Sequence, residues 1–595
     1  MLSIGDRRSH EPQRSPLSPS RWIPLSLAVV LWLLAAACRL GPEASVPAVE
    51  PIYQDVRSWK ADIHVTRARG TSRTLRGVPL TELVATYNEG RAKLRDTLAA
   101  IRADPRSPDD RRALAAMRRA FEEELEEVTS PSPGSEASVS LDCAYDPAQL
   151  ADGVNGLKNL SDRMYACFGR AAADLSFEGQ ALDRLTILSL LALTDDEARR
   201  RRLFLALEPV WRSINGDAGP ATSPYRQLVR LSAAKVLAGQ GSIESGAANL
   251  GIEAGLVEGW LTAELEAWRH IIPDETLEPW DFAYLAGKAN RDLSPVIPRD
   301  ALKAINDRYY RDLGADVATL GIHYDLEPRR GKSPVAFTTF GARPRLADGA
   351  WVEGEPWVFA SYAVGGVDNL SELLHETGHA VHVASLRTRP AFMDWPDNDA
   401  FNEAIADVPA LEMFEPAWQR RYLGMSVPLA DAIRAKYAGI VMDTAWALFE
   451  LRMLRNPAGD PNRVWAEITG RYLRIRPHPE LSWWAVRGQL ITMPGYMVTY
   501  AIGAIAAADL RARVKEVHGP YAEGDPTWYA WMSDRLYRFG LERPSRRVLE
   551  DFLGRPLSPR ALLDDLARAG VRPTASPCPF SGAASRATAS RSRPP

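Results

Sequence analysis

Three of the nine histidines in this chain lie within eight residues, in the stretch "DNLSELLHETGHAVHVA" (368–384). The leucines of the stretch recur at helical spacing, Asp368 can cap its start, and Pro390 lies beyond its expected end. Residues i and i+4 share one face of a helix, so His375 and His379 can reach a single ion. The stretch therefore predicts a helix that carries two metal ligands and packs against the segment that supplies the remaining ligand.

Within "HETGH", Glu376 lies beside the paired histidines without being a ligand. It can accept a proton from a water molecule that a metal activates, which is the chemistry of metal-assisted hydrolysis. A five-residue pattern with two free positions also arises by chance, so the motif needs further support. His382 is three residues further on, and we interpret it as a packing residue or a partner of a ligand.

A catalytic zinc site takes three protein ligands, so the third must come from elsewhere. The stretch "DNDAFNEAIADVPALEMFE" (397–415) offers Glu403 and Asp407, four residues apart on an expected second helix. Glu403 would bind the metal, and Asp407 would hydrogen-bond a ligand imidazole from behind. Both could instead be ordinary solvated charges, but their neighbours are mostly apolar, and this favours a site.

The rest of the chain predicts a mainly α protein. Helical patterns fill 77–127 and 147–272, and strand-like alternation is confined to 333–341 and 356–364. At 595 residues the chain is too long for one simple core, so we expect a helical domain over 56–570 built from two subdomains. We interpret 129–138 as a linker and 571–595 as a disordered tail.

Composition excludes several classes of function. The chain is 46% hydrophobic and 25% charged, as a globular protein is, and its net charge of −3 argues against a nucleic-acid partner. The four cysteines show no metal-ligand spacing, so a zinc ion must be held by histidines and carboxylates. A disulfide between Cys143 and Cys167 is possible.

The N-terminus has the layout of an export signal. A region with arginines and prolines precedes the apolar run "WIPLSLAVVLWLLAAAC", which ends at Cys38. We expect residues 1–38 to be a signal, Cys38 to be lipidated and 39–55 to form a tether. The alternative is an uncleaved anchor, although about 16 apolar residues is short of the roughly 20 that a span needs. In either case the body lies outside the cytoplasm, in the periplasm or at the cell surface, and meets the membrane only through its N-terminus.

The metal motif and the stretch "FNEAIADVPAL", in which Glu403 stands twenty-eight residues after His375, resemble the angiotensin-converting-enzyme family of zinc dipeptidases. Other stretches resemble the related thimet oligopeptidase family: "PWDFAYLAGKANRD" (279–292), "RRGKSPVAF" (329–337), "PWVFASYAVGGVDNLSELLHETGHAVH" (356–382) and "GYMVTYAIGAIAAADL" (495–510). The resemblance implies a two-lobed helical enzyme with a deep central cleft and a small sheet lining the active site. It also implies one Zn²⁺ per chain, and a strand edge in 356–364 that pairs with the backbone of a short peptide substrate.

In these families, tyrosines donate hydrogen bonds to the oxyanion formed during hydrolysis, and Tyr496 and Tyr500 match their place. The histidine that usually precedes them is missing from 487–496. His478 is the nearest histidine. Arg487 could bind a peptide carboxylate, although most arginines in such positions are structural.

Two further positions depart from the families. Gly503 replaces a later tyrosine of the oligopeptidases, and Thr499 replaces an arginine of the converting enzymes. These departures affect transition-state stabilisation and substrate choice rather than metal binding.

The sequence thus predicts a monomeric zinc metallopeptidase for short unfolded peptides, either a dipeptidyl carboxypeptidase or an oligoendopeptidase, with Glu376 activating water. Two alternatives stay open. One is a catalytically impaired surface lipoprotein that binds peptides, which the missing histidine favours and the intact Glu376 disfavours. The other is a purely structural zinc site.

Overall fold

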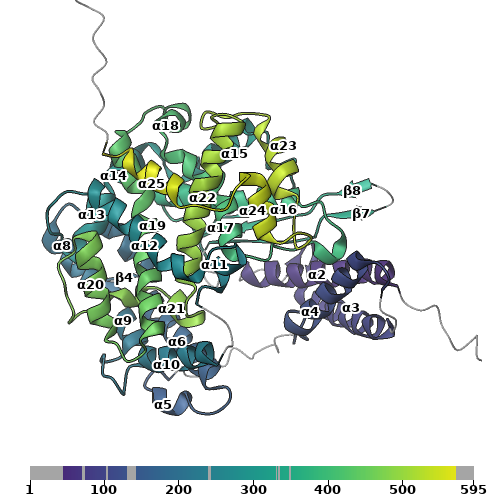
Figure 1. The fold of residues 1–595 in the computed structure, drawn as a ribbon, viewed down its shortest axis with the longest axis horizontal. Helices are drawn as coiled ribbons and strands as arrows, with labels where there is room; N and C mark the ends of the chain where they lie inside the picture. Colours follow the sequence, from purple (N-terminus) through teal and green to yellow (C-terminus); the bar gives the residue numbers. More distant parts are fainter. Residues whose placement is uncertain are drawn as a thin grey trace, which may run out of the picture.

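The computed structural model describes residues 45–570, with gaps at 70–73, 102–104, 130–141, 239–242, 330–331, 333–335 and 348–349. The described chain is mainly helical, as predicted (Figure 1). The predicted signal (1–38) with Cys38, most of the expected linker and the tail (571–595) lie outside the described residues. Among the helices of the described part, none is long and apolar enough to cross a membrane.

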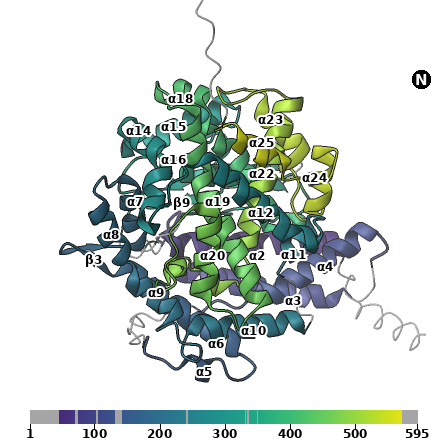
Figure 2. The same ribbon diagram turned by 60° about the vertical axis from the view of Figure 1, so that its left-hand side comes forward.

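The N-terminal helices form a group of their own on one side of the main body, drawn in purple in Figure 1 and Figure 2. This group consists of α2 (Val46–Ala68), β1 (Thr74–Leu75), β2 (Val78–Pro79), α3 (Leu80–Ala100) and α4 (Pro108–Glu123). The prediction of a tether over 39–55 is wrong from residue 46 onward. Val46, Val49, Tyr53 and Val56 recur at helical spacing and are buried in the core of this group.

The lower part of the main body in Figure 1 is built from helices of the first half of the chain together with α20 and α21. The segments before the central sheet are α5 (Pro147–Leu150), α6 (Gly156–Ala173), β3 (Leu175–Phe177), β4 (Gln180–Leu182), α7 (Arg184–Leu193), α8 (Glu197–Leu205), α9 (Glu208–Asn215), α10 (Pro224–Leu237), α11 (Ser245–Asn249), α12 (Ala254–Ile271), η1 (Pro279–Asp281), α13 (Phe282–Ala286), α14 (Lys288–Leu293), η2 (Ser294–Val296), η3 (Arg299–Ala301) and α15 (Leu302–Asp312). The possible disulfide is present, between Cys143 and Cys167 of α6.

The sheet beside the histidine helix has three strands in the order β5 (His323–Asp325), β9 (Trp357–Phe359), β6 (Phe337–Thr339). β9 is parallel to β5 and antiparallel to β6, so both of its edges are occupied. The prediction that 356–364 offers a free edge is therefore wrong, and β6 is an outer strand instead. A hairpin of β7 (Arg345–Ala347) and β8 (Ala350–Val352) lies apart from this sheet.

The second half of the chain carries the helices of the site. They are α16 (Val367–Ser385), η4 (Pro390–Phe392), α17 (Asp399–Ala410), η5 (Leu411–Phe414), α18 (Pro416–Leu423), α19 (Leu429–Arg455), α20 (Pro461–Leu473), η6 (Trp483–Val486), α21 (Gln489–Thr492), α22 (Met497–Val517), α23 (Trp528–Met532), the π-helix η7 (Ser533–Tyr537), α24 (Ser545–Leu553) and α25 (Arg560–Ala567). α17 packs between α16 and α22, and α22 packs on α19.

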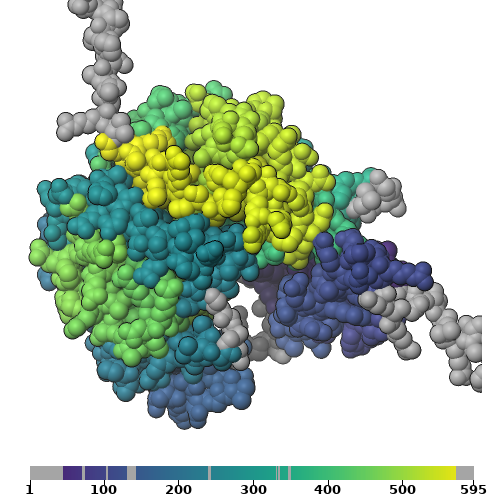
Figure 3. Space-filling model, in the orientation of Figure 1, coloured from purple at the N-terminus to yellow at the C-terminus, as the bar shows by residue number. Residues whose placement is uncertain are grey.

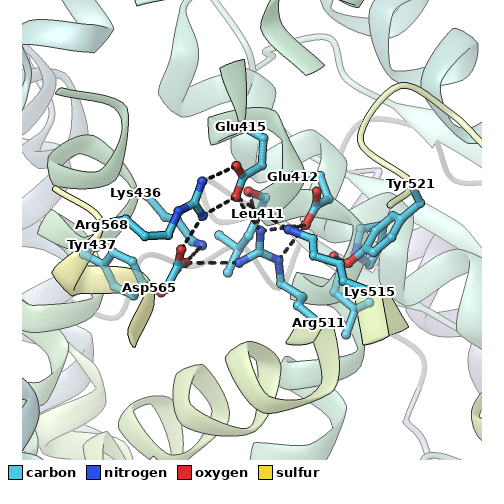
Figure 4. A network of polar contacts seen from close by, with 12 residues as sticks. Leu411, Glu412, Glu415, Lys436, Tyr437, Arg511, Lys515, Tyr521, Asp565 and Arg568 are labelled. Atoms are coloured by element: carbon cyan, nitrogen blue, oxygen red, sulfur yellow. Dashed lines mark hydrogen bonds and ion pairs between the residues drawn. The ribbon is translucent and has the colours of Figure 1, made fainter. Parts of the chain in front are cut away.

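A largely buried network of charges ties α25, the last described helix, to this helical core (Figure 4). Arg511 of α22 donates to Glu412 of η5 at 2.6 Å, and Lys515 lies 2.8 Å from the same carboxylate oxygen. Arg568, just after α25, pairs with Glu415 at 2.7 Å. The segment that directly follows α17 is thus held from two sides by charged contacts.

Candidate active site

The histidine helix α16 begins after Gly366, whose φ of 103° is the left-handed conformation that favours glycine. Asp368 does not cap the helix, contrary to the sequence prediction. It lies in the first turn of the helix, where a negative charge is favourable. Its side chain accepts a hydrogen bond from the Asn290 side chain at 2.7 Å.

His375, His379 and Glu403 come together at one point, with a ligand atom of each within 4.8 Å of the others. Nε2 of His379 lies 3.1 Å from Nε2 of His375, which lies 3.4 Å from Oε2 of Glu403. Ligand atoms at about 2.0–2.2 Å from a tetrahedral zinc ion lie roughly 3.3–3.6 Å apart. Two imidazoles and a carboxylate gathered this closely could hold a metal ion, and the two measured separations are near those of a zinc site.

Glycines at the helix contacts allow this convergence. A Cβ on Gly378 would lie 2.6 Å from the backbone oxygen of Ala406, so glycine lets α16 touch α17. On the other side of α17, a Cβ on Gly503 of α22 would lie 3.3 Å from the Cβ of Glu403. Gly503 therefore has a packing role next to the predicted ligand.

Asp407 lies one turn after Glu403, and its Oδ1 is 2.8 Å from Nδ1 of His375. A proton held on Nδ1 by this carboxylate leaves Nε2 free to bind a metal. Burial and the charge of the neighbouring His375 lower the pKa of His379, so this imidazole is neutral, as a ligand must be. Burial opposes a charge on His375, but Asp407 and Glu403 raise the pKa of His375 well above its usual value. His375 therefore has to release a proton from Nε2 when a metal binds there.

Glu376 is buried beside the two histidines. Burial raises its pKa to about 7, although His375 and a hydrogen bond from Thr338 work in the opposite direction. The Thr338 hydroxyl on β6 lies 2.8 Å both from Oε2 of Glu376 and from its backbone oxygen. A carboxylate held in this way can take and release a proton near neutral pH. Nothing in the sequence of β6 singled out Thr338 for this role.

Tyr496 and Tyr500 lie at the start of α22, with ring centroids 5.3 Å apart. Burial and the Glu403 charge raise the pKa of Tyr500 to about 12, while burial, Asp399 and Glu403 raise that of Tyr496 further. Both phenols thus stay protonated and can donate hydrogen bonds.

Sequence reasoning missed the residue that holds the Tyr496 backbone. Glu450 of α19 is buried, and its two carboxylate oxygens accept the backbone N–H groups of Gly495 and Met497, each at 2.9 Å. These two groups flank Tyr496 directly. Burial raises the pKa of Glu450 to about 7. A glutamate in an amphipathic helix carries no sequence signal for such a role.

The other two histidines considered lie outside the cluster. His382 is fully buried against Trp395 and Tyr537, and burial lowers its pKa to about 4, so it is a packing residue. His478 pairs with Glu278 at 2.9 Å and Glu480 at 2.6 Å. It is not part of the cluster formed by His375, His379 and Glu403.

The sequence matches no family model and no curated protein. The structure is similar to one described as an oligoendopeptidase F, with a TM-score of 0.53 and 18% identity, covering 89% of this chain and 96% of that one. The structure of Pz peptidase A with an inhibitor is similar with a TM-score of 0.53 and 15% identity, covering 89% of this chain and 97% of that one.

An M32 carboxypeptidase from Deinococcus radiodurans R1 gives a TM-score of 0.52 and 14% identity, covering 88% of this chain and 99% of that one. These likenesses show the fold. None of these three structures is named as a converting enzyme or a thimet oligopeptidase, so that finer resemblance stays a prediction.

Proposed function

We propose that this chain is a zinc metallopeptidase that hydrolyses short unfolded peptides. The observation that carries the proposal is the convergence of His375, His379 and Glu403, with Glu376 beside them. The three solved structures with the same fold are all named as peptidases, which supports the choice of peptide bonds as the substrate.

The residues divide the work as follows. His375, His379 and Glu403 would hold the ion, and Asp407 fixes the His375 ring through Nδ1. Zinc, when bound, polarises a carbonyl group and makes water more acidic.

Glu376 takes the proton from the attacking water and delivers it to the leaving amine, with Thr338 holding its carboxylate in place. Tyr500 and Tyr496 donate hydrogen bonds to the oxyanion, each a contribution of a few kcal/mol in a dry site.

The shape of the molecule supports a peptide substrate. Figure 3 shows the surface hollowed between the N-terminal helices and the lower part of the main body. We infer that this hollow belongs to the cleft between two lobes, which admits extended peptides and excludes folded proteins. A substrate backbone would pair with the outer strand β6, because β9 has no free edge.

The catalytic test uses Glu376→Gln with Glu178→Gln as a surface control, both measured for zinc content and for cleavage of a mixed peptide library. We expect stoichiometric zinc in both variants, and loss of cleavage by at least about 100-fold in Glu376→Gln alone. A wild-type protein that holds zinc and cleaves no peptide would establish the alternative, an impaired peptidase that binds peptides. A chelator that removes zinc without affecting cleavage would refute zinc dependence.

We further propose that the protein works as a monomer outside the cytoplasm, with Cys38 lipidated. Mass spectrometry of the mature N-terminus would separate lipidation from simple cleavage and from an uncleaved anchor.

A further inference from the structure

A cavity of about 290 Å³ lies where α11, α17 and α22 meet (Figure 1). Its lining comes from three segments, within 243–249 at α11, 397–400 at the start of α17, and 493–499 at the turn that leads into α22. Two of these segments are tied together directly, because the Asn398 side chain donates to the backbone oxygen of Gly246 at 2.7 Å. The walls of the cavity thus belong to packed helices and to the turns that join them.

The cavity adjoins the predicted metal site. Asp399 in its wall and the predicted ligand Glu403 are four residues apart on α17, so they share a face and lie about 6 Å apart along the helix axis. Tyr496, a predicted oxyanion donor, also lines the cavity, and its ring centroid lies 5.3 Å from that of Tyr500. An extended chain advances about 3.4 Å per residue, so the cavity lies within about two residues of a peptide bond held at the metal.

Asp399 places an unpaired charge in this cavity. It is exposed to solvent, and among the described residues none donates a hydrogen bond to its side chain or forms an ion pair with it. The other carboxylate of the lining, Asp397, accepts the N–H and the hydroxyl of Ser545 at 2.8 and 2.6 Å. The described residues that line the cavity include no lysine, arginine or histidine. Desolvation and the charge of Glu403 raise the pKa of Asp399, as expected for a carboxylate without a cation beside it.

We propose that this cavity binds the side chain of a substrate lysine or arginine within two residues of the scissile bond, and that Asp399 selects it. The inference rests on the proposed function and adds to it a preference for basic peptides. A long apolar stem with a charged end suits the lining, in which Ile243, Met493 and Pro494 can contact the stem. Asp399 and the side-chain oxygen of Asn249 can accept hydrogen bonds from the charged end.

The first experiment digests a mixed library of N-acetylated peptides with the wild-type enzyme and identifies the products by mass spectrometry. Acetylation removes the N-terminal ammonium, so that basic side chains supply the cations. We expect lysine and arginine to be enriched at one position within two residues of the cut. Two synthetic peptides with lysine or norleucine at that position should then differ about 10-fold in kcat/KM, the low end for a hydrogen bond to a charged group, because water reaches Asp399.

Substitutions in the cavity then assign the preference. Asp399→Asn should remove the difference between the two peptides by reducing cleavage of the lysine peptide, whereas a merely structural role would reduce cleavage of both and keep the difference. Asp399→Lys should reverse the preference, towards a peptide with glutamate at the same position. Met493→Lys brings a competing cation into the cavity from an exposed residue and should also remove the lysine preference, so the site is tested even if the Asp399 variants do not fold. Asp564→Asn is the matched control, because Asp564 is an exposed aspartate of α25.

The outcomes separate the two proposals. Equal cleavage of the lysine and norleucine peptides by the wild-type enzyme overturns the cavity site and leaves the peptidase intact. A lysine preference that survives both Asp399→Asn and Met493→Lys also overturns it, because another group then binds the cation. Cleavage of the norleucine peptide at the rate of the lysine peptide once its N-terminus is free would overturn it too, since the N-terminal ammonium would be the ligand. Cleavage of no peptide in the library overturns the proposed function, and this inference with it.

Discussion

Replacing Arg511 by methionine should destabilise the protein, because the change leaves a buried carboxylate short of a partner (Figure 4). Arg511 is 4% exposed and donates through Nε and Nη2 to Oε1 of Glu412, at 3.0 and 2.6 Å, while Glu412 is fully buried. Methionine preserves most of the apolar stem of arginine, so the loss is chiefly electrostatic. Removing one partner of a buried pair costs about 3–5 kcal/mol.

Lys515 determines where in that range the loss falls. It lies 2.8 Å from the same Glu412 oxygen and is 34% exposed, so it continues to neutralise the carboxylate. We therefore expect about 3 kcal/mol for Arg511→Met. Arg513→Met is the matched control on the same helix, since its pair with Glu516 is exposed and contributes at most about 1 kcal/mol.

The assay is urea unfolding followed by far-UV circular dichroism, with the slope of the transition compared among variants to check that only stability has changed. Adding Glu412→Gln to Arg511→Met should recover part of the loss, because the buried negative charge is then removed too. Equal midpoints for Arg511→Met and Arg513→Met, or a double variant less stable than Arg511→Met, would refute this account of the network.

Further predictions concern the site and the response to acid. Asp407→Asn should weaken zinc binding about 10- to 100-fold, measured by competition with a chromophoric chelator, because the His375 ring loses its orienting acceptor; unchanged affinity would contradict that role. Glu450→Gln should lower kcat more than it raises KM, since one oxygen that holds the backbone beside Tyr496 becomes a donor; an unchanged kcat would count against it. Burial would raise the pKa of Glu415, but its hydrogen bond from Arg568 and nearby cations lower it from 4.5 to about 2. The unfolded state therefore takes up the proton first, and about 3 kcal/mol of stability present above pH 4.5 is lost as the pH falls towards 2; a flat unfolding midpoint over that range would be inconsistent with the shift.

The predictable part of the site was the part that helix geometry dictates. Spacings of four residues place His375 with His379, and Glu403 with Asp407, on common faces whatever the rest of the chain does. These two faces can meet because Gly378 has no side chain at the contact. The sequence does not show this role of Gly378, because it depends on a residue that is a neighbour only in space. Thr338 and Glu450 were missed for the same reason, because each acts on a residue from a distant segment. Pair contacts of this kind leave no periodic signal in one sequence.

The errors in the fold have equally local causes. The sequence at 46–56 alternates apolar and polar residues at helical spacing, and this pattern decides its structure although the segment lies close to the predicted export signal. The predicted strands are longer than the observed ones, which have three residues each. The reason is that β-branched and aromatic residues continue beyond the paired positions. Both edges of β9 are paired because of the order of the strands in the sheet. Residue propensities predict where strands form but do not predict this order.

The placement of α17 between α16 and α22 has a consequence for how the protein responds to chelators. The predicted ligands come from two helices joined by a connection of about a dozen residues, so a bound ion acts as a removable cross-link across their interface. At free zinc a thousandfold above the dissociation constant, such a cross-link adds about 4 kcal/mol to the folded state. Loss of the ion should therefore make the connection between α16 and α17 more sensitive to proteases, and resistance to digestion would serve as a gauge of zinc occupancy that needs no substrate.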